Sequence, residues 1–168
     1  MKLNASLTTP RLMLSPLSAT DKEALLALFM DPVVKQTYIV PDFKNEEMAT
    51  AFFERLMTLS CGEERFLLGI YHNQHLIGIV NEVETTQTHM ELGYAIAPSY
   101  HNQGFMTEAL KGVISHLKAY GVPRIRTGAF SENYASLRVM EKCGMKPIAY
   151  TETIEYRAKT HTCLFFEI

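Results

Sequence analysis

A polar loop that joins an apolar strand to an amphipathic helix is the part of this chain best suited to bind an anion. The strand is expected over 91–96, the loop contains Gly104, and a helical pattern begins near Thr107. The first turn of a helix has backbone N–H groups without intrahelical partners, and the helix dipole adds partial positive charge there. Gly104 would let the backbone approach phosphate oxygens without a Cβ clash. The pattern therefore predicts a pyrophosphate site, with a plain helix cap as the alternative.

The spacing of the histidines and cysteines does not indicate a metal site. The chain has six histidines and three cysteines, and they are dispersed along its length. A metal site needs three or four converging ligands, and no segment shows such a spacing. Three scattered thiols also argue against a disulfide framework. We therefore expect no metal ligands, reduced cysteines and a cytoplasmic location.

Composition predicts one globular domain over 1–168. Apolar residues make up 47% and charged residues 20%, and the formal net charge is −2. This balance excludes a largely disordered chain and leaves no basic excess for general nucleic-acid binding. No stretch approaches the roughly 18 apolar residues of a membrane span, and the first residues lack the apolar core of a signal peptide. We expect neither a nucleic-acid partner nor a membrane.

The elements that position the loop follow an α+β order. Four apolar residues from Leu110 to Leu117 recur at helical spacing, which predicts a helix over 107–120. Thr20 and Glu23 have the spacing of a capping box for an earlier helix. Further helices are expected after Asn45 and over 133–143, and strands over 12–17, 65–71, 76–84, 91–96, 125–130, through Tyr150 and over 163–166. These elements predict a mixed, mostly antiparallel sheet with helices on its faces.

The loop resembles the acetyl-CoA loop of the GCN5-related N-acetyltransferases, the GNAT superfamily. Their pattern is Arg/Gln-x-x-Gly-x-Gly/Ala, and Gly104 takes the place of its central glycine. His101 stands at the Arg/Gln position and Met106 at the final small position, so two of the three positions differ. His101 can still donate a hydrogen bond, and the backbone N–H of Met106 is still available.

Three other stretches resemble the same family in the same order. Asn133-x-x-Ser136 and its helix, which ends at Gly144, resemble a signature downstream of the loop. The segment 7–17 resembles the opening strand of the branch that acetylates the N-termini of ribosomal proteins, and the segment 76–80 resembles its central Ile-Gly strand. The resemblance covers nearly the whole chain. It implies a GNAT fold of about six to seven strands and about four helices, with a splayed cofactor-binding cleft.

The resemblance also implies which residues bind acetyl-CoA. A strand would offer its backbone to the pantetheine amides, the loop and the first helical turn would hold the pyrophosphate, and the second helix would begin beside the thioester. These residues are Tyr94, Ala95 and Ile96; His101, Asn102, Gln103, Gly104, Phe105, Met106 and Thr107; and Asn133 and Ser136.

Direct acetyl transfer to an amine needs a proton donor for the departing thiolate and an acceptor for the amine's proton. The resemblance favours Ser136 as the donor, with Tyr134 as a second candidate. Glu155 and Glu91 are the candidate bases, together with the carboxylates that end the strand before Glu91. Each of these carboxylates could equally be a solvated strand charge.

The resemblance leaves the acceptor open, as a protein N-terminus or a small-molecule amine. It also leaves open whether the protein is a monomer or a homodimer. The departures at His101 and Met106 motivate one alternative function, a non-catalytic acyl-CoA-binding sensor on the same fold.

Overall fold

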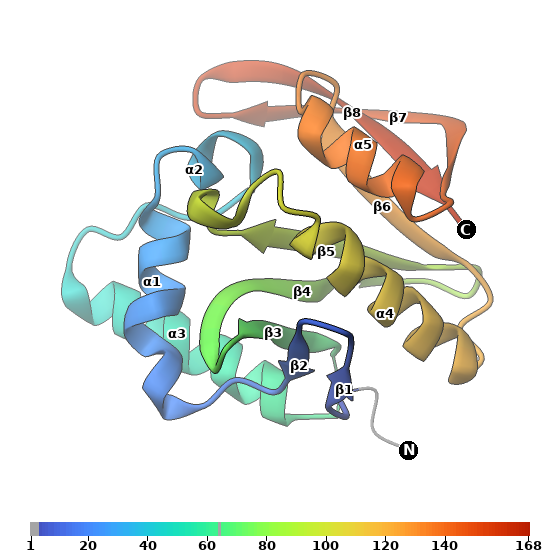
Figure 1. Ribbon diagram of the computed structural model, residues 1–168. Helices are drawn as coiled ribbons and strands as arrows, with labels where there is room; N and C mark the ends of the chain where they lie inside the picture. Colours follow the sequence, from blue (N-terminus) through green and yellow to red (C-terminus); the bar gives the residue numbers. More distant parts are fainter. Residues whose placement is uncertain (1–3, 64) are drawn as a thin grey trace.

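In the computed structural model, which describes residues 4–63 and 65–168, eight strands form one sheet with helices on both faces (Figure 1). The strand order is β1-β2-β3-β4-β5-β6-β8-β7. The helices are α1 (Lys22–Met30), α2 (Val34–Thr37), α3 (Glu46–Cys61), α4 (Phe105–Ala119) and α5 (Tyr134–Lys142). The strands are β1 (Leu7–Thr8), β2 (Met13–Ser15), β3 (Leu67–His72), β4 (His75–Thr85), β5 (Met90–Ile96), β6 (Ile125–Phe130), β7 (Lys146–Tyr156) and β8 (Lys159–Glu167).

The sheet is antiparallel except where β5 meets β6. These two strands pair in parallel only from Met90 to Leu92, opposite Ile125 to Thr127. Beyond this point, Gly93–Ile96 pairs with β4 alone, and the rest of β6 pairs with β8. One edge of β5 therefore keeps unpaired backbone groups at the centre of the sheet. The splay of the sheet that the family resemblance implies is confirmed.

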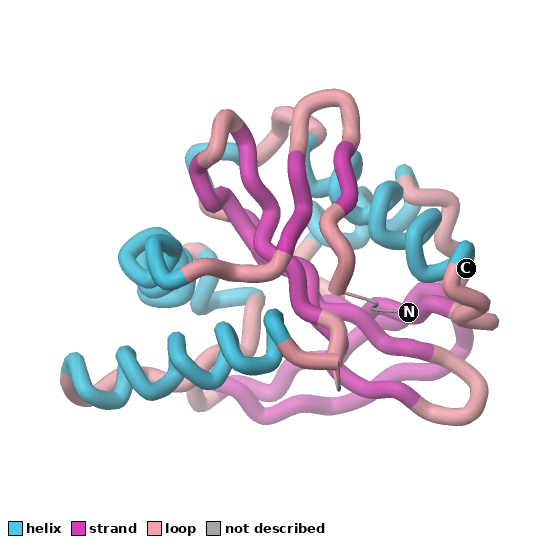
Figure 2. The backbone as a smooth tube through the Cα atoms, turned by 90° about the horizontal axis from the view of Figure 1, so that it is seen from below, coloured by secondary structure: helices cyan, strands magenta, loops and turns pink. Residues whose placement is uncertain are grey.

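Figure 2 shows helices on both faces of the sheet. Two hydrophobic clusters hold them there. On one face, the predicted stripe of α4 is buried, with Leu110, Val113 and Leu117 fully covered. On the other face, α1 and α3 pack through residues such as Phe29 and Phe53. The amphipathic pattern of α4 thus fixes the helix beside the cleft, because its apolar side must be covered.

The predicted start of the first helix is wrong. Ser18 and Asp21, rather than Thr20 and Glu23, form the capping box, and the backbone N–H of Ser18 donates to Asp21 Oδ2 at 2.7 Å. The hydroxyl of Tyr71 on β3 also donates to Asp21 Oδ2, at 2.7 Å. This long-range contact fixes the position of Asp21, and no local pattern reveals it.

Other local predictions are confirmed. The side chain of Asn45 accepts a hydrogen bond from the backbone N–H of Met48 at 2.9 Å and caps α3. Asn73 and Gln74 both have positive φ, as the tight turn between β3 and β4 requires. The sequence did not reveal β1 and α2, which have two and four residues and are too short to show a period. In the part of the chain that is described, no helix is long and apolar enough to cross a membrane.

Candidate active site

The loop before α4 presents backbone N–H groups to a cavity. Gly104 is the N-cap of α4 and has a left-handed backbone, with φ 78°. The backbone N–H of Glu108 donates to the Gly104 carbonyl, so helix geometry leaves the N–H groups of Phe105, Met106 and Thr107 without intrahelical partners. These three residues line the cavity. The arrangement has the donors and the dipole that an anion site needs.

The side chains of the loop stabilise the loop itself. His101 Nε2 donates to the Ile96 carbonyl at 3.0 Å, and Gln103 Nε2 donates to the Ser99 carbonyl at 2.8 Å. The side chain of Met106 is buried in the core beside that of Phe105. Met106 replaces the Gly or Ala of the family pattern, but its side chain takes little space from the cavity because it points into the protein. The N–H groups of this turn have no intrahelical partner.

Arg11 ties the N-terminal segment to this loop. Its Nη1 donates to the Gln103 carbonyl at 3.0 Å, its Nε pairs with Glu108 Oε2 at 2.7 Å, and its guanidinium lies 4.3 Å from the ring centroid of Phe105. The family resemblance covers the segment around Arg11 but assigns this residue no role. The contacts show that Arg11 holds the loop against the first turn of α4.

A cavity of about 350 Å³ extends from this turn along the free edge of β5 to α5. Of the predicted cofactor residues, it is lined by Tyr94, Ala95, Ile96, His101, Asn102, Gly104, Phe105, Met106, Thr107, Asn133 and Ser136, whereas Gln103 is not among the lining residues. Arg138 and Lys142 also line it, and the sequence reasoning missed both. Their i, i+4 spacing on α5 was the available signal, since such residues share one face of a helix.

Ser136 is oriented by two neighbours. Asn133 Oδ1 accepts from the backbone N–H of Ser136 at 3.2 Å, and Asn133 Nδ2 donates to Ser136 Oγ at 3.0 Å. The hydroxyl of Tyr94 donates to the Ser136 carbonyl at 3.2 Å. Because Ser136 Oγ accepts the bond from Asn133, its own proton remains available for a group in the cavity. Asn133 thus caps α5 and also positions the hydroxyl.

Two other candidates lie away from the cavities. Tyr134 is 72% exposed and lines neither of the two cavities described here. Glu155 is exposed on β7, where its carboxylate accepts a hydrogen bond from the Thr160 hydroxyl, and it also lines neither cavity. Nothing in this geometry brings either side chain to Ser136.

A second cavity, of about 490 Å³, meets the first where β5 and β6 separate. Both cavities are lined by Thr37, Tyr38, Gly93, Gly128 and Ala129. The charged residues of the second cavity are Arg65, Glu82, Glu91 and Glu152, and its apolar wall includes Phe130 and Phe165. Three carboxylates against one guanidinium make this cavity acidic, which suits a cationic ligand.

Besides Glu82, the candidate base that the structure brings into a cavity is Glu91. Its side chain is partly buried, and burial raises the pKa of its carboxyl to about 7, with a further upward contribution from the nearby charge of Glu152. The opposite charge of Arg126 reduces this shift. On the same cavity wall, the hydroxyl of Tyr38 donates to Asn81 Oδ1 at 2.7 Å.

Comparisons with known proteins agree with this architecture. A family model described as an acetyltransferase (GNAT) domain matches residues 11–146. A Bacillus subtilis (strain 168) protein named "uncharacterized N-acetyltransferase YoaA" is 30% identical over 145 residues, which cover 83% of this chain and 82% of the relative.

Solved structures show the same fold. A GNAT-family acetyltransferase from Bacillus anthracis has a TM-score of 0.82 at 22% identity, covering 98% of each chain. RimL, a ribosomal L7/L12 alpha-N-protein acetyltransferase solved with coenzyme A, has a TM-score of 0.83 at 17% identity, covering 98% of this chain and 97% of RimL. The family match over most of the sequence shows that this chain belongs to the GNAT acetyltransferases, enzymes that use acetyl-CoA as their acetyl donor.

Proposed function

We propose that this protein transfers an acetyl group directly from acetyl-CoA to a primary amine of a protein N-terminus or a small molecule. The donor lies in the first cavity and the amine enters through the second. The observation that carries the proposal is the wall that the two cavities share at the separation of β5 and β6, where Gly93, Gly128 and Ala129 line both cavities. Two ligands entering from opposite sides could meet there without a covalent acetyl-enzyme.

The first cavity fits the donor by its chemistry. Free N–H groups at the start of α4, together with Arg138 and Lys142, suit a pyrophosphate and a further phosphate. The unpaired edge of β5 suits the pantetheine amides, which can pair with it as an added strand does. Bound in this way, acetyl-CoA supplies an acetyl thioester beside the start of α5.

Ser136 protonates the departing thiolate in this proposal. Asn133 holds its oxygen, and the hydroxyl proton is free to point into the cavity. Ser136 also lies in the first turn of α5, where the helix dipole favours developing negative charge. The same hydroxyl could instead bind the donor without transferring a proton, so kinetics and affinity must be measured separately.

The acidic wall of the second cavity serves the amine. An alkyl amine is mostly protonated at neutral pH, so it arrives as an ammonium ion. Glu82, Glu91 and Glu152 attract this charge into the cavity. Glu91, on the strand that reaches the shared wall, receives the proton directly or through a water molecule before the amine attacks.

The test combines binding with turnover. Calorimetric titration should show saturable binding of acetyl-CoA, and ATP should not bind. Thiol release from acetyl-CoA should then be measured with a peptide bearing a free N-terminus, the same peptide with a blocked N-terminus, a polyamine and an amino-sugar. Turnover requires a free amine and should show the intersecting double-reciprocal lines of a ternary complex.

Three outcomes would contradict the proposal. Absence of acetyl-CoA binding would remove the donor site. Parallel lines would indicate a covalent acetyl-enzyme instead of direct transfer. Tight acetyl-CoA binding without turnover on any amine of the panel would favour the non-catalytic sensor.

A further inference from the structure

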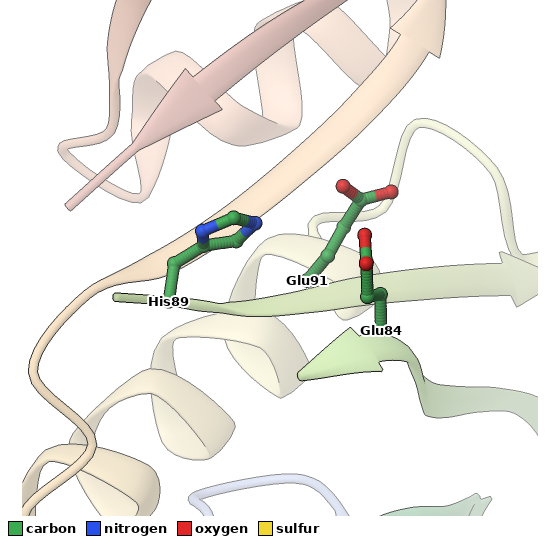
Figure 3. A group of neighbouring side chains, drawn as sticks. All are labelled: Glu84, His89 and Glu91. Carbon is green, nitrogen blue, oxygen red and sulfur yellow. The ribbon is translucent and has the colours of Figure 1, made fainter. Parts of the chain in front are cut away.

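Three potential metal ligands converge where β4 turns into β5. Glu84 lies on β4, His89 ends the turn, and Glu91 lies on β5; Figure 3 shows the His89 ring directed toward the two carboxylates. One donor atom from each lies within 4.8 Å of the other two. Spacing along the sequence did not reveal this group, because a strand pairing brings Glu84 to the others.

A β-bulge creates the pairing. Glu82 is opposite Leu92 and Glu84 is opposite Glu91, so Val83 is the extra residue on β4. Without the bulge, the exposed apolar side chain of Val83 would be opposite Glu91. With it, the carboxylates of Glu84 and Glu91 share one face, and His89, two residues before Glu91, lies on that face as well.

His89 provides a second, independent indication of a cation site. Its side chain is only 8% exposed, and its Nε2 is buried without a hydrogen-bond partner. Its Nδ1 lies 3.1 Å from the hydroxyls of both Thr86 and Thr88. The ring is therefore held at one nitrogen while the other points toward the carboxylates (Figure 3). Buried polar atoms are normally paired, so this atom requires an explanation.

In the described part of the chain, no lysine or arginine forms an ion pair with Glu84 or Glu91. Arg126 and Arg124 act electrostatically on His89. The guanidinium of Arg126 binds Glu167 Oε1 through Nε at 2.9 Å and Nη2 at 2.7 Å, and Arg124 Nε donates to the Thr88 carbonyl at 3.2 Å. Among the described residues, the carboxylates of Glu84 and Glu91 receive no hydrogen bond. A small cation would satisfy both carboxylates and the orphan nitrogen together.

We propose that Glu84, His89 and Glu91 bind one divalent first-row transition cation, of which Zn²⁺ is the probe. An imidazole nitrogen suits zinc and its neighbours, whereas Mg²⁺ and Ca²⁺ select oxygen ligands. Three protein ligands and a remaining open position form a common zinc coordination set. The threonine hydroxyls at Nδ1 provide the outer contacts that fix a ligating ring.

The ligands must move slightly inward to bind the ion. Zinc bonds of about 2.1 Å place tetrahedral donors about 3.4 Å apart. The glutamate side chains can close the remaining distance by torsion, because no hydrogen bond holds their carboxylates in place. Glu91 also lines the second cavity, so a bound cation would compete with an incoming ammonium group for this carboxylate.

The experiment is a titration of the chelator-treated chain, residues 1–168, with Zn²⁺. Binding is measured by calorimetry and by the visible absorption of Co²⁺ in the same site. One equivalent should bind to the unaltered protein. Glu84→Gln and His89→Gln should each weaken binding of that equivalent at least 10-fold. His75→Gln is the matched control, since His75 is an exposed histidine at the other end of β4 and should leave the affinity unchanged.

Acetyl-CoA affinity and the melting temperature of each variant, measured in chelator, show whether it is folded. Because Glu84 is exposed, Glu84→Gln should retain both values even if His89→Gln does not fold. Absence of saturable Zn²⁺ binding would overturn the proposal. So would a loss of Zn²⁺ affinity in His75→Gln equal to that in Glu84→Gln and His89→Gln. The readout is metal binding alone, so the result is independent of acetyl transfer.

Discussion

The two cavities that meet between β5 and β6 are built in different ways. In the first, the groups suited to a ligand are largely backbone, at the start of α4 and along the unpaired edge of β5, although its lining residues extend from Val33 to Lys142. The second is formed by side chains from segments as distant as Arg65, Glu91 and Glu152. A binding site made of backbone depends on the fold and tolerates changes of side chain. A site made of side chains depends on which residues the fold brings together.

This difference explains why the departures at His101 and Met106 leave the loop intact. The ring of His101 binds the Ile96 carbonyl and the side chain of Met106 enters the core, so neither blocks the helix start. The second cavity should not tolerate such substitutions, because its negative charge comes from individual carboxylates. The comparison can be tested from the largest expected effect to the smallest.

Gly104→Asp should have the largest effect, raising the Kd for acetyl-CoA by about 100-fold or more. It places a carboxylate where we propose that the pyrophosphate binds and forces a side chain into a left-handed backbone, which costs about 1 to 2 kcal/mol. An added Cβ there contacts no protein atom closer than 3.5 Å, so the loss would arise at the ligand. Calorimetry measures the Kd.

Gly121→Asp is the matched control. Gly121 has the same backbone handedness, with φ 85°, beyond the far end of α4, and an added Cβ meets nothing within 4 Å. This variant should lose stability without losing acetyl-CoA affinity. Equal losses of affinity in the two variants would mean that general strain, and not the loop, governs binding.

Ser136→Ala should lower kcat by about 30-fold while changing the Kd for acetyl-CoA less than twofold, since general acid catalysis is worth about that much or more. The Asn133 cap on the backbone N–H of residue 136 remains, so α5 should persist. Steady-state kinetics and calorimetry separate the two quantities. Ser115→Ala, exposed in mid-α4, is the control. Matching losses of kcat and affinity would assign Ser136 a binding role.

Glu91→Gln should change how stability depends on pH. The pKa of Glu91 is raised in the folded protein from 4.5 to about 7, so its stabilising contribution is complete below about pH 4.5 and is lost as the pH rises through 7. The variant should therefore gain about 1 to 2 kcal/mol relative to the unaltered protein between pH 5 and pH 8, after allowance for solvent screening.

Urea unfolding in chelator at both pH values measures this gain. Glu54→Gln, at an exposed position on α3, is the control and should show no such trend. A parallel pH dependence in Glu91→Gln and the unaltered protein would mean that Glu91 is solvated in the native state.

Arg157→Met should have the smallest effect, raising the KM for the amine about 3-fold without changing acetyl-CoA affinity. Arg157, in the β7–β8 turn, binds both carboxylate oxygens of Asp42 and the Lys35 carbonyl, and so anchors the segment around Tyr38 over the second cavity. Exposed ion pairs contribute little to stability, so the expected change in KM is small. Arg55→Met on α3 is the control. A larger effect on acetyl-CoA than on the amine would contradict this assignment.

Much of the first cavity could be predicted from the sequence. The apolar stripe of α4, the glycine before it and the Asn133 cap are local patterns, and each has the expected role in the fold. Arg138 and Lys142 were missed because a basic pair on a helix is usually a solvated face. The sequence indicated the residues of the second cavity only as separate candidates, without showing that they lie together. Of Glu91 and Glu155, the fold brings Glu91 to a cavity.

The sequence by itself determined the α+β class and the helix start after Gly104, because periodicity, glycine and capping residues act over a few neighbouring positions. The family followed from the resemblance of its ordered motifs. Only the tertiary structure decided where β5 leaves β6, which carboxylates share a cavity, and that a bulge at Val83 brings Glu84 opposite Glu91. These features depend on strand register and long-range packing. A shift of one residue in register exchanges the two faces of a strand, and the local sequence does not fix that choice.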